Sequence, residues 1–494
     1  MDQSTIDELR AATVGPQANL INGKSVASES GEEMEVISPI DGSVLTTLAR
    51  STPQDMNSAI ASAKAAFDDG RWCNQPPAAR KKVIHKWADL VEYHALELAV
   101  LGVRDNGTEI SMAYKAEPLS AAGTLRYYAE AIDKIYGEIA PTADNVLGLV
   151  HYEPVGVVGA IIPWNFPLMI GAWKLSPALA VGNSVVVKPP ETASLTLVRL
   201  AELALEAGLP EGVLNVVTGD GAVVGEALAL SNEVSVLAFT GSGTTGRRLL
   251  NYSARSNLKR VFLELGGKSP HIIFNDTSDL EKAANVVAGG IFRNSGQVCV
   301  AGSRLLVQKD IQQDFTNAVT QASKTLQPGD PLQLSTKSGA INSAAQLQQN
   351  LAAVETAVSE GGEVVLGGRQ CLTETGGFYM EPTIVDNVQA HHSVFQKEVF
   401  GPVLTITPFA DEAEAVALAN ATDYGLASGV WTSDLSRAHR MVRAINAGVV
   451  HVNTYGGADG TVPLGGVGQS GNGSDKSLHA IDKYINLKTA WIQL

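Results

Sequence analysis

The sequence predicts an α/β fold with two parallel-sheet units and a small extended flap. Short β-branched segments alternate with helical patterns twice along the chain, once before Asp276 and once after it. Strands that alternate with helices pair in parallel, and strands that are apolar throughout lie in a sheet covered on both faces. With 494 residues the chain is also too long for one hydrophobic core, which favours two large domains.

The elements of the two units follow from the periodicity of apolar residues. From about Asp55 to Tyr128 they recur at spacings of three and four, which predicts helices. The first set of strands is predicted at EPVGVVGAIIP, SVVVKPPE, VLNVVTG, VSVLAFTG and RVFLELGG. The second set is SRLLVQK, FGPVLTITPF, SGVWTS and AGVVHVN, with helices at DEAEAVALANA and LSRAHRMVRAINA. Two such units suggest a cleft between them, and ligands of parallel sheets lie beyond the carboxyl ends of the strands.

Two amphipathic extended segments fit neither unit. They are DKIYGEIAPTADNVLGLVHYEP and the C-terminal YINLKTAWIQL. We expect them to pair with each other or with another subunit.

Composition and charge exclude several classes of function. The formal net charge is -15 and the longest run of Lys and Arg is Arg80-Lys81-Lys82, so nucleic acid is not an expected partner. The three cysteines, Cys73, Cys299 and Cys371, are far apart and odd in number, which argues against disulfides and for a reducing compartment. Cys73 and Cys371 are expected to be inert core residues. No metal-ligand spacing, signal peptide or membrane-spanning run is present, so we expect a cytoplasmic protein without a metal.

Two motifs that follow predicted strands are typical of nucleotide sites. In FTGSGTTGRR, Gly241, Gly243 and Gly246 would let the backbone at a helix start approach a phosphate, although a plain strand-to-helix turn would look the same. In VVVKPPETAS, Lys188 and Glu191 are placed to bind ribose hydroxyls, the alternative being solvated loop charges. A carboxylate at Glu191 repels a 2′-phosphate, which favours NAD over NADP.

Three further residues are candidates for chemistry. Prolines on both sides of Asn165 in PWNFP fix its amide, which is either a preorganised oxyanion donor or an incidental loop side chain. Glu264 lies within the apolar strand LELGG, as a general base or as half of a structural salt bridge. Cys299 is followed by small residues in QVCVAGS, which leaves its sulfur accessible, whereas most cysteines only pack.

Taken together, the motifs resemble those of the aldehyde dehydrogenase superfamily, in that family's order and over nearly the whole chain. The motifs are PWNFP, KPPE, FTGS with a glycine four residues on, LELGGK, GQVC, EVFGPV and the C-terminal PLGG-SG stretch. The resemblance implies an aldehyde dehydrogenase-like fold of two Rossmann-like domains and a small β oligomerisation flap. The implied ranges are 1–130 and 152–265 for the NAD-binding domain, 266–475 for the catalytic domain, and 131–151 and 480–494 for oligomerisation. A homodimer or homotetramer is expected.

The resemblance also implies roles for residues at matching positions. Cys299 would attack the aldehyde carbonyl, Asn165 and the Cys299 backbone N–H would form the oxyanion hole, and Glu264 would activate water to hydrolyse a thioester. The phosphate turn is then FTGS with Gly246 rather than a GxGxxG motif. The implied cofactor positions are Lys188 and Glu191 at the adenosine ribose, Gly221 at the adenine, Gly241 and Ser242 at the pyrophosphate, Trp164 in the nearby loop, and Glu398 and Phe400 at the nicotinamide ribose and ring.

Substrate preference is the least constrained feature. VWTSDLSRAHRM, SGNGSDKSLHAIDKY and YAEAIDKIYGE resemble the γ-glutamyl-γ-aminobutyraldehyde dehydrogenase type. The chain departs from the family at Leu464, where an aromatic residue is usual, at Gly468, where a lysine is usual, and at Ser474, where an arginine is usual. Leu464 is expected to reshape the substrate tunnel. Asp459, in YGGADGTVP, either binds a cationic substrate tail or, as we favour, its own turn.

The expected function is therefore NAD-dependent oxidation of an aldehyde, amino or otherwise polar, to the carboxylic acid through a cysteine thiohemiacetal and thioester. NADP is the less favoured cofactor. One alternative is acyl transfer to coenzyme A, in which a thiol replaces water and Glu264 has no role. The other is a structural or binding protein that has kept the fold without the activity.

Overall fold

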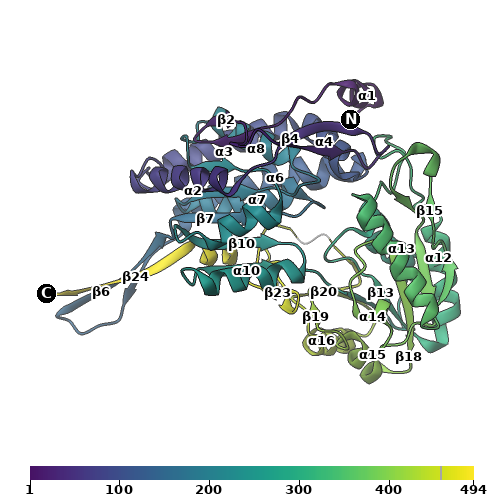
Figure 1. The fold of residues 1–494 in the computed structure, drawn as a ribbon. Helices are drawn as coiled ribbons and strands as arrows, with labels where there is room; N and C mark the ends of the chain where they lie inside the picture. The colour runs from purple at the N-terminus through teal and green to yellow at the C-terminus, as the bar shows by residue number, and fades with distance from the viewer. Residues whose placement is uncertain (457–458) are drawn as a thin grey trace.

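The chain, described for residues 1–456 and 459–494 of a computed structural model, forms two sheet-centred bodies and a projecting arm (Figure 1). The first sheet has the strand order β2-β1-β9-β8-β7-β10-β11-β23. Its five central strands, β9 to β11 in that order, are parallel, and β1, β2 and β23 are antiparallel additions at the edges. The bounds are β1 (Asn19–Ile21), β2 (Lys24–Val26), β7 (Val157–Ile161), β8 (Ser184–Lys188), β9 (Leu214–Val216), β10 (Val234–Thr240), β11 (Arg260–Glu264) and β23 (Gly471–Asn472).

Helices cover both faces of this sheet because its central strands are apolar on both sides. One core joins the strands to α3 (Pro77–Tyr93), α6 (Ser120–Ala131), α7 (Pro167–Ala180) and α8 (Leu195–Ala207). A second core on the other face involves α2 (Pro53–Asp68), α9 (Glu226–Leu230) and α10 (Gly243–Arg255). Further N-terminal elements are α1 (Gln3–Ala11), the hairpin β3 (Glu33–Ile37) and β4 (Val44–Ala49), α4 (Ala95–Asn106), α5 (Ile110–Tyr114) and the π-helix η1 (Lys115–Leu119).

The second sheet repeats the same layered plan. Its strand order is β14-β17-β18-β13-β12-β20-β21, and all neighbours except β14 and β17 are parallel. The strands are β12 (Pro270–Ile273), β13 (Arg304–Gln308), β14 (Glu363–Leu366), β17 (Thr383–Asp386), β18 (Val403–Phe409), β20 (Ala427–Trp431) and β21 (Val449–Val452). One core holds α11 (Leu280–Phe292) and α12 (Gln312–Ser323), and the other holds α13 (Ala344–Ser359), α14 (Ser393–Gln396), α15 (Glu412–Ala419) and α16 (Leu435–Ala444).

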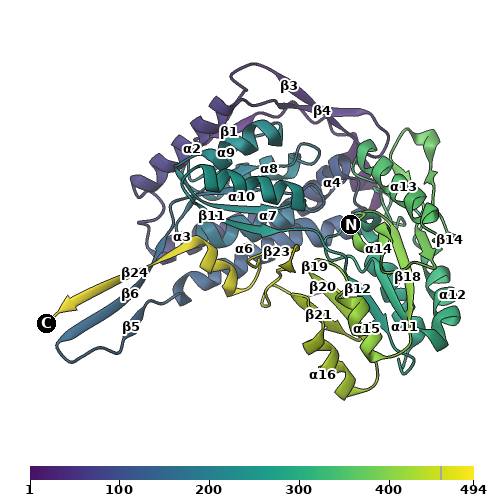
Figure 2. The same cartoon turned by 60° about the horizontal axis from the view of Figure 1, so that its bottom comes forward.

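The projecting arm is formed by the two segments that fitted neither unit. β24 (Ile485–Gln493) pairs along its whole length with β6 (Val146–Pro154), and β6 pairs with β5 (Glu138–Ala140). Figure 2 shows the three strands leaving the body together. The prediction that these segments pair with each other is confirmed.

The predicted α/β class with two parallel sheets is confirmed, with differences at its edges. The sequence did not predict β12 as a separate strand. In LELGGKSPHII its apolar residues follow those of β11 after only two glycines and a short polar stretch. β23 lies in the range predicted as catalytic but joins the first sheet beside Glu264. None of the described helices is long and apolar enough to cross a membrane.

Candidate active site

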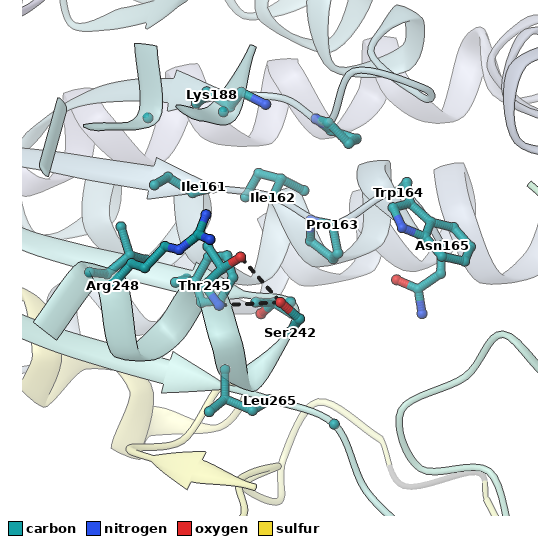
Figure 3. Close-up of a pocket in the computed structure, with 18 of the residues that line it drawn as sticks. Ile161, Ile162, Pro163, Trp164, Asn165, Lys188, Ser242, Thr245, Arg248 and Leu265 are labelled. Atoms are coloured by element: carbon teal, nitrogen blue, oxygen red, sulfur yellow. Dashed lines mark hydrogen bonds between the residues drawn. The ribbon is translucent and has the colours of Figure 1, made fainter. Parts of the chain in front are cut away.

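A pocket of about 570 Å³ lies beyond the carboxyl ends of β7, β8, β10 and β11, the edge where parallel sheets bind ligands. Residues 346, 349 and 398–400 close it from the side of the second body. Figure 3 shows Lys188, Asn165 and Ser242 approaching one space from separate strand ends. The predicted site residues in its lining are Trp164, Asn165, Lys188, Glu191, Gly221, Gly241, Ser242, Cys299, Glu398 and Phe400.

At one end of the pocket an ion pair forms directly after β8. Lys188 Nζ lies 2.8 Å from Glu191 Oε1, and the same oxygen accepts a 2.6 Å hydrogen bond from Gly221 N. Burial lowers the pKa of Lys188, and the Glu191 carboxylate opposes this shift. A Cβ at Gly221 would lie 3.2 Å from Glu191 Oε1, so a side chain there would crowd the carboxylate. The Lys188 ammonium and the Glu191 carboxylate lie beside a glycine, which leaves the backbone open to a ligand. Such a pair can bind the adjacent hydroxyls of a sugar.

The middle of the pocket is formed by the N-terminus of α10. Ser242 is the N-cap, and its Oγ accepts from Thr245 N at 3.3 Å (Figure 3). The free N–H groups of this 13-residue helix and its dipole favour a phosphate. The structure does not bring Gly246 to the pocket wall. A Cβ there would lie 3.1 Å from Leu265, so Gly246 instead lets α10 pack closely on the segment after β11.

The opposite end of the pocket is closed by residues from both bodies. Trp164 and Phe400 meet edge to face with centroids 5.2 Å apart. Glu398 Oε1 accepts from Gly267 N at 2.9 Å, and a Cβ at Gly266 would lie only 2.0 Å from the other carboxylate oxygen. Burial raises the pKa of Glu398 to about 7. The glycine pair therefore lets a carboxylate reach the pocket from the second body.

Cys299 lines this same end, beside Asn165. Asn165 Nδ2 donates to Gln297 O at 2.9 Å, so its amide is fixed next to the cysteine loop. Burial, with Glu398 and then Glu264 adding to it, raises the pKa of the Cys299 thiol to about 12. The resting thiol is therefore protonated at neutral pH, and its attack on a carbonyl needs a proton acceptor or a stabilised anion.

Glu264 ends β11 and has an unusual environment. Its Oε1 is buried without a hydrogen-bond partner. Burial, and next the nearby Asp475, raise its pKa well above the ordinary value, although Lys174 and Lys483 oppose this. A carboxyl group with a raised pKa and an unpaired oxygen is suited to taking a proton from water.

Beside Glu264 lies a buried charge cluster that the sequence analysis missed. Asp475 accepts from Lys174 Nζ at 2.8 Å and from Lys483 Nζ. Burial alone would raise the pKa of Asp475, but the two ammonium groups outweigh it and hold the pKa below the ordinary value. The signal that could have found this cluster is Lys174 itself, a lysine within the apolar helix LMIGAWKLSPALA.

Comparison with known proteins agrees with this geometry. The profile of the aldehyde dehydrogenase family matches residues 25–490. The chain belongs to the aldehyde dehydrogenase family. It is 47% identical over 477 residues to the NADP/NAD-dependent aldehyde dehydrogenase PuuC of Escherichia coli (strain K12), covering 96% of this chain and 95% of the relative.

Two solved structures superpose over the full length of both chains. One is a mutant of P. syringae AldA indole-3-acetaldehyde dehydrogenase in complex with NAD+ and IAA, with a TM-score of 0.99 and 47% identity. The other is γ-glutamyl-γ-aminobutyraldehyde dehydrogenase from Burkholderia cenocepacia J2315, with a TM-score of 0.98 and 46% identity. The chain is thus an aldehyde dehydrogenase, an oxidoreductase, and the resemblance seen in the sequence is confirmed.

The two residues considered for substrate contact, Asp459 and Leu464, lie outside the lining of this pocket. Asp459 Oδ1 accepts from Thr461 N at 2.8 Å and from the Thr461 hydroxyl, so it caps its own turn outside the pocket lining. Leu464 also lies outside the lining, and its N–H and C=O pair with the backbone of Asp475 at 2.8 and 2.7 Å. Gly468 has φ +60° and pairs in a small sheet, where a lysine would be strained.

The other cysteines differ from the prediction. Cys73 and Cys371 are half-buried rather than in the core, and neither lines the pocket. Among the described residues, no group of three or more His, Cys, Asp or Glu side chains is placed to hold a metal ion.

Proposed function

We propose that this aldehyde dehydrogenase oxidises its aldehyde to the carboxylic acid with NAD as hydride acceptor, using Cys299 as nucleophile. The observation that carries the proposal is one continuous pocket with Cys299 and Asn165 at one end and the Lys188–Glu191 pair at the other. A helix N-terminus lies between them. A dinucleotide has the same order of parts: ribose, pyrophosphate and a reactive ring.

The proposed reaction assigns one task to each residue at the reactive end. Cys299 loses its thiol proton to solvent as Sγ bonds to the carbonyl carbon, and the resulting oxyanion is held by Asn165 Nδ2 and the Cys299 backbone N–H. Bound NAD would accept the hydride that leaves this thiohemiacetal carbon. Glu264 then takes a proton from water, whose oxygen bonds to the thioester carbon, and the Cys299–carbon bond breaks to release the acid.

The cofactor preference is proposed to follow from Glu191. Its carboxylate, fixed by Lys188 and Gly221, would accept from ribose hydroxyls and repel a 2′-phosphate. The relative PuuC is named as a dehydrogenase dependent on NADP or NAD, so a close relative is described with both cofactors. We expect a higher kcat/KM with NAD than with NADP.

The proposed substrate is an amino-aldehyde or another polar aliphatic aldehyde. Support comes from the likeness to the Burkholderia cenocepacia γ-glutamyl-γ-aminobutyraldehyde dehydrogenase. The indole-3-acetaldehyde dehydrogenase has nearly the same identity, so overall likeness does not select the substrate. Comparing kcat/KM for amino, acidic, aliphatic and aromatic aldehydes tests the proposal, and a preference for aromatic aldehydes would contradict it.

The arm is proposed to join subunits into a homodimer or homotetramer. It exposes large apolar side chains, among them Ile139 (75% exposed), Leu487 (68%) and Trp491 (67%). Apolar groups in such number on a projecting arm favour burial against another copy. Light scattering on the wild type and on a Trp491→Lys variant would test this, and a monomeric wild type would contradict it.

The decisive experiment for the activity is NADH formation from a panel of aldehydes, with product analysis in the presence and absence of coenzyme A. Formation of NADH and free carboxylic acid, with or without coenzyme A, supports the proposal. A product that appears only as an acyl-coenzyme A would assign the acylating reaction. Absence of NADH formation with all aldehydes and both cofactors would favour a protein that has kept only the fold.

A further inference from the structure

The two donors of the proposed oxyanion hole come from segments far apart in the chain. Asn165 precedes α7, whereas the Cys299 N–H belongs to the loop after α11. The segments meet at Gln297 O, which accepts from Asn165 Nδ2 at 2.9 Å and from Asn294 Nδ2 at 3.3 Å. The distance between the two donors therefore depends on how each segment is held.

The cysteine loop begins with a strained turn. Asn294, Ser295 and Gly296 have φ values of 48°, 51° and 74°, a left-handed run that non-glycine residues rarely adopt. Glu109 holds this turn, because both of its carboxylate oxygens accept from Asn294 N, at 3.3 and 3.2 Å. Thr108 Oγ1 adds a 2.7 Å bond to Asn294 Oδ1. Conformational strain of this kind persists only where its surroundings fix it.

The Asn165 segment is held in a related way. α7 starts at Pro167, and its N-cap residue Phe166 has no side-chain oxygen to bind the first N–H groups. Glu117 supplies the missing acceptor from another element, since its Oε2 accepts from Met169 N at 2.6 Å. Burial raises the pKa of Glu117 to about 8, and the bond to Met169 N opposes this shift.

Both carboxylates lie on one short segment of the first body. Glu109 immediately precedes α5, and Glu117 lies in the π-helix η1, a type of helical distortion often found at functional sites. Their side chains are almost completely buried, at 2% and 4% exposed. We propose that Glu109 and Glu117 are positioning residues that set the separation of the two oxyanion donors, Glu109 through the Cys299 loop and Glu117 through Asn165. This rests on the proposed function of those donors.

The chain offers a matched control in the preceding helix, α4. Asp105 is equally buried and also accepts one backbone N–H, from Leu195 at 3.1 Å. Leu195 begins α8 and carries neither oxyanion donor. Replacing Asp105 by leucine therefore removes a comparable buried bond without releasing either donor.

The experiment compares two reactions of Cys299 in the full-length protein. Acylation by p-nitrophenyl acetate needs the Cys299 thiolate and the oxyanion hole, whereas alkylation by iodoacetamide needs the thiolate but forms no oxyanion. The ratio is compared only between variants whose circular dichroism matches that of the wild type, because an unfolded chain would be alkylated without being acylated and would lower the ratio. We expect Glu109→Leu and Glu117→Leu to lower the ratio by roughly 10- to 100-fold, because a displacement of about 1 Å costs that much in a positioned reaction.

Conservative variants separate positioning from simple destabilisation. Glu109→Gln and Glu117→Gln keep an acceptor at the same reach and should retain the ratio within about fivefold, a bound set by one neutral hydrogen bond. Glu109→Asp and Glu117→Asp keep the carboxyl group but shorten the side chain, and should lower the ratio about tenfold. The aspartate variants also serve if the leucine variants do not fold.

A double-mutant cycle tests the route of the effect. If Glu117 acts through Asn165, adding Glu117→Leu to Asn165→Ala should lower the ratio no further than Asn165→Ala alone. An unchanged ratio in the Glu109 and Glu117 variants, an equal fall in the Asp105→Leu control, or additive losses in the cycle would overturn the inference. A wild type that is not acylated at Cys299 would instead refute the proposed function.

Discussion

The two ends of the pocket are built differently. At the Lys188–Glu191 end the functional groups are three residues apart in the chain, follow one strand and form a pair whose carboxylate is 38% exposed. At the Cys299 end, the groups come from separate segments of both bodies; Asn165 is buried, and Glu264, Cys299 and Glu398 are half-buried. The Lys188–Glu191 end can therefore be formed by local structure, whereas the Cys299 end forms only when the two bodies are correctly packed against each other.

The electrostatics differ in the same direction. At the Lys188 end each charge has an opposite charge 2.8 Å away. At the Cys299 end burial raises the pKa of Cys299, Glu264 and Glu398 together, which keeps protons on groups that must lose them in the reaction. The binding residues therefore already carry the charges that bind a ligand. The reacting residues still hold protons that they lose only after substrate and cofactor bind.

The largest expected effect at the reactive end is that of Cys299→Ala. Without the nucleophile no thiohemiacetal forms, and dehydrogenase and esterase rates should fall by about four orders of magnitude or more. NAD affinity, measured by isothermal titration calorimetry, should change by less than about threefold, because binding rests on the other end. Residual activity above one per cent would assign the chemistry to another residue.

The next effect is that of Glu264→Gln. Loss of the base should slow hydrolysis of the thioester by roughly 10²- to 10⁴-fold, so a burst of NADH should precede a slow steady rate. The raised pKa of Glu264 means that the proton stays on at a higher pH than in a free glutamate, so wild-type turnover should fall as the pH is lowered. Rapid-mixing absorbance at 340 nm checks the burst, and an unchanged acid limb of the pH profile in the variant would contradict this role.

Asn165→Ala should have a smaller effect, confined to the step that forms the oxyanion. Removal of one such donor costs about 3 kcal/mol, or about 10² in rate. Acylation by p-nitrophenyl acetate should fall accordingly, while alkylation of Cys299 by iodoacetamide should not. Equal losses in both reactions would mean that Asn165 supports the loop through its bond to Gln297 and not the transition state.

The same contrast explains how much the sequence could predict. Lys188, Glu191 and Ser242 follow strands that are recognisable from short apolar runs, so their meeting at one sheet edge could be expected. The Lys174–Asp475 pair joins residues 301 positions apart, and no local pattern encodes such a contact. The resemblance to a family supplied Cys299, Asn165 and Glu264 as partners.

Other features were outside the reach of sequence patterns for a physical reason. Glu109 and Glu117 stand in a helical stretch where acidic residues are usually exposed, and only the fold buries them against two backbone N–H groups. For Asp459 the favoured expectation was a bond to its own turn, and its carboxylate does accept from Thr461 N. Local hydrogen bonding of this kind competes with any role in binding.

The smallest effect is expected at the Lys188–Glu191 end, where Glu191→Gln should change cofactor preference and little else. The glutamine keeps an oxygen for a ribose hydroxyl and removes the charge that repels a 2′-phosphate. The ratio of kcat/KM for NADP to that for NAD should rise roughly tenfold, which corresponds to about 1.4 kcal/mol. Glu226→Gln is the matched control: Glu226 lines the same end but accepts from the Tyr252 hydroxyl at 2.9 Å, so its charge is not aimed at the ribose. If both variants shift the ratio equally, the preference follows from the net charge of the pocket and not from the fixed Glu191 carboxylate.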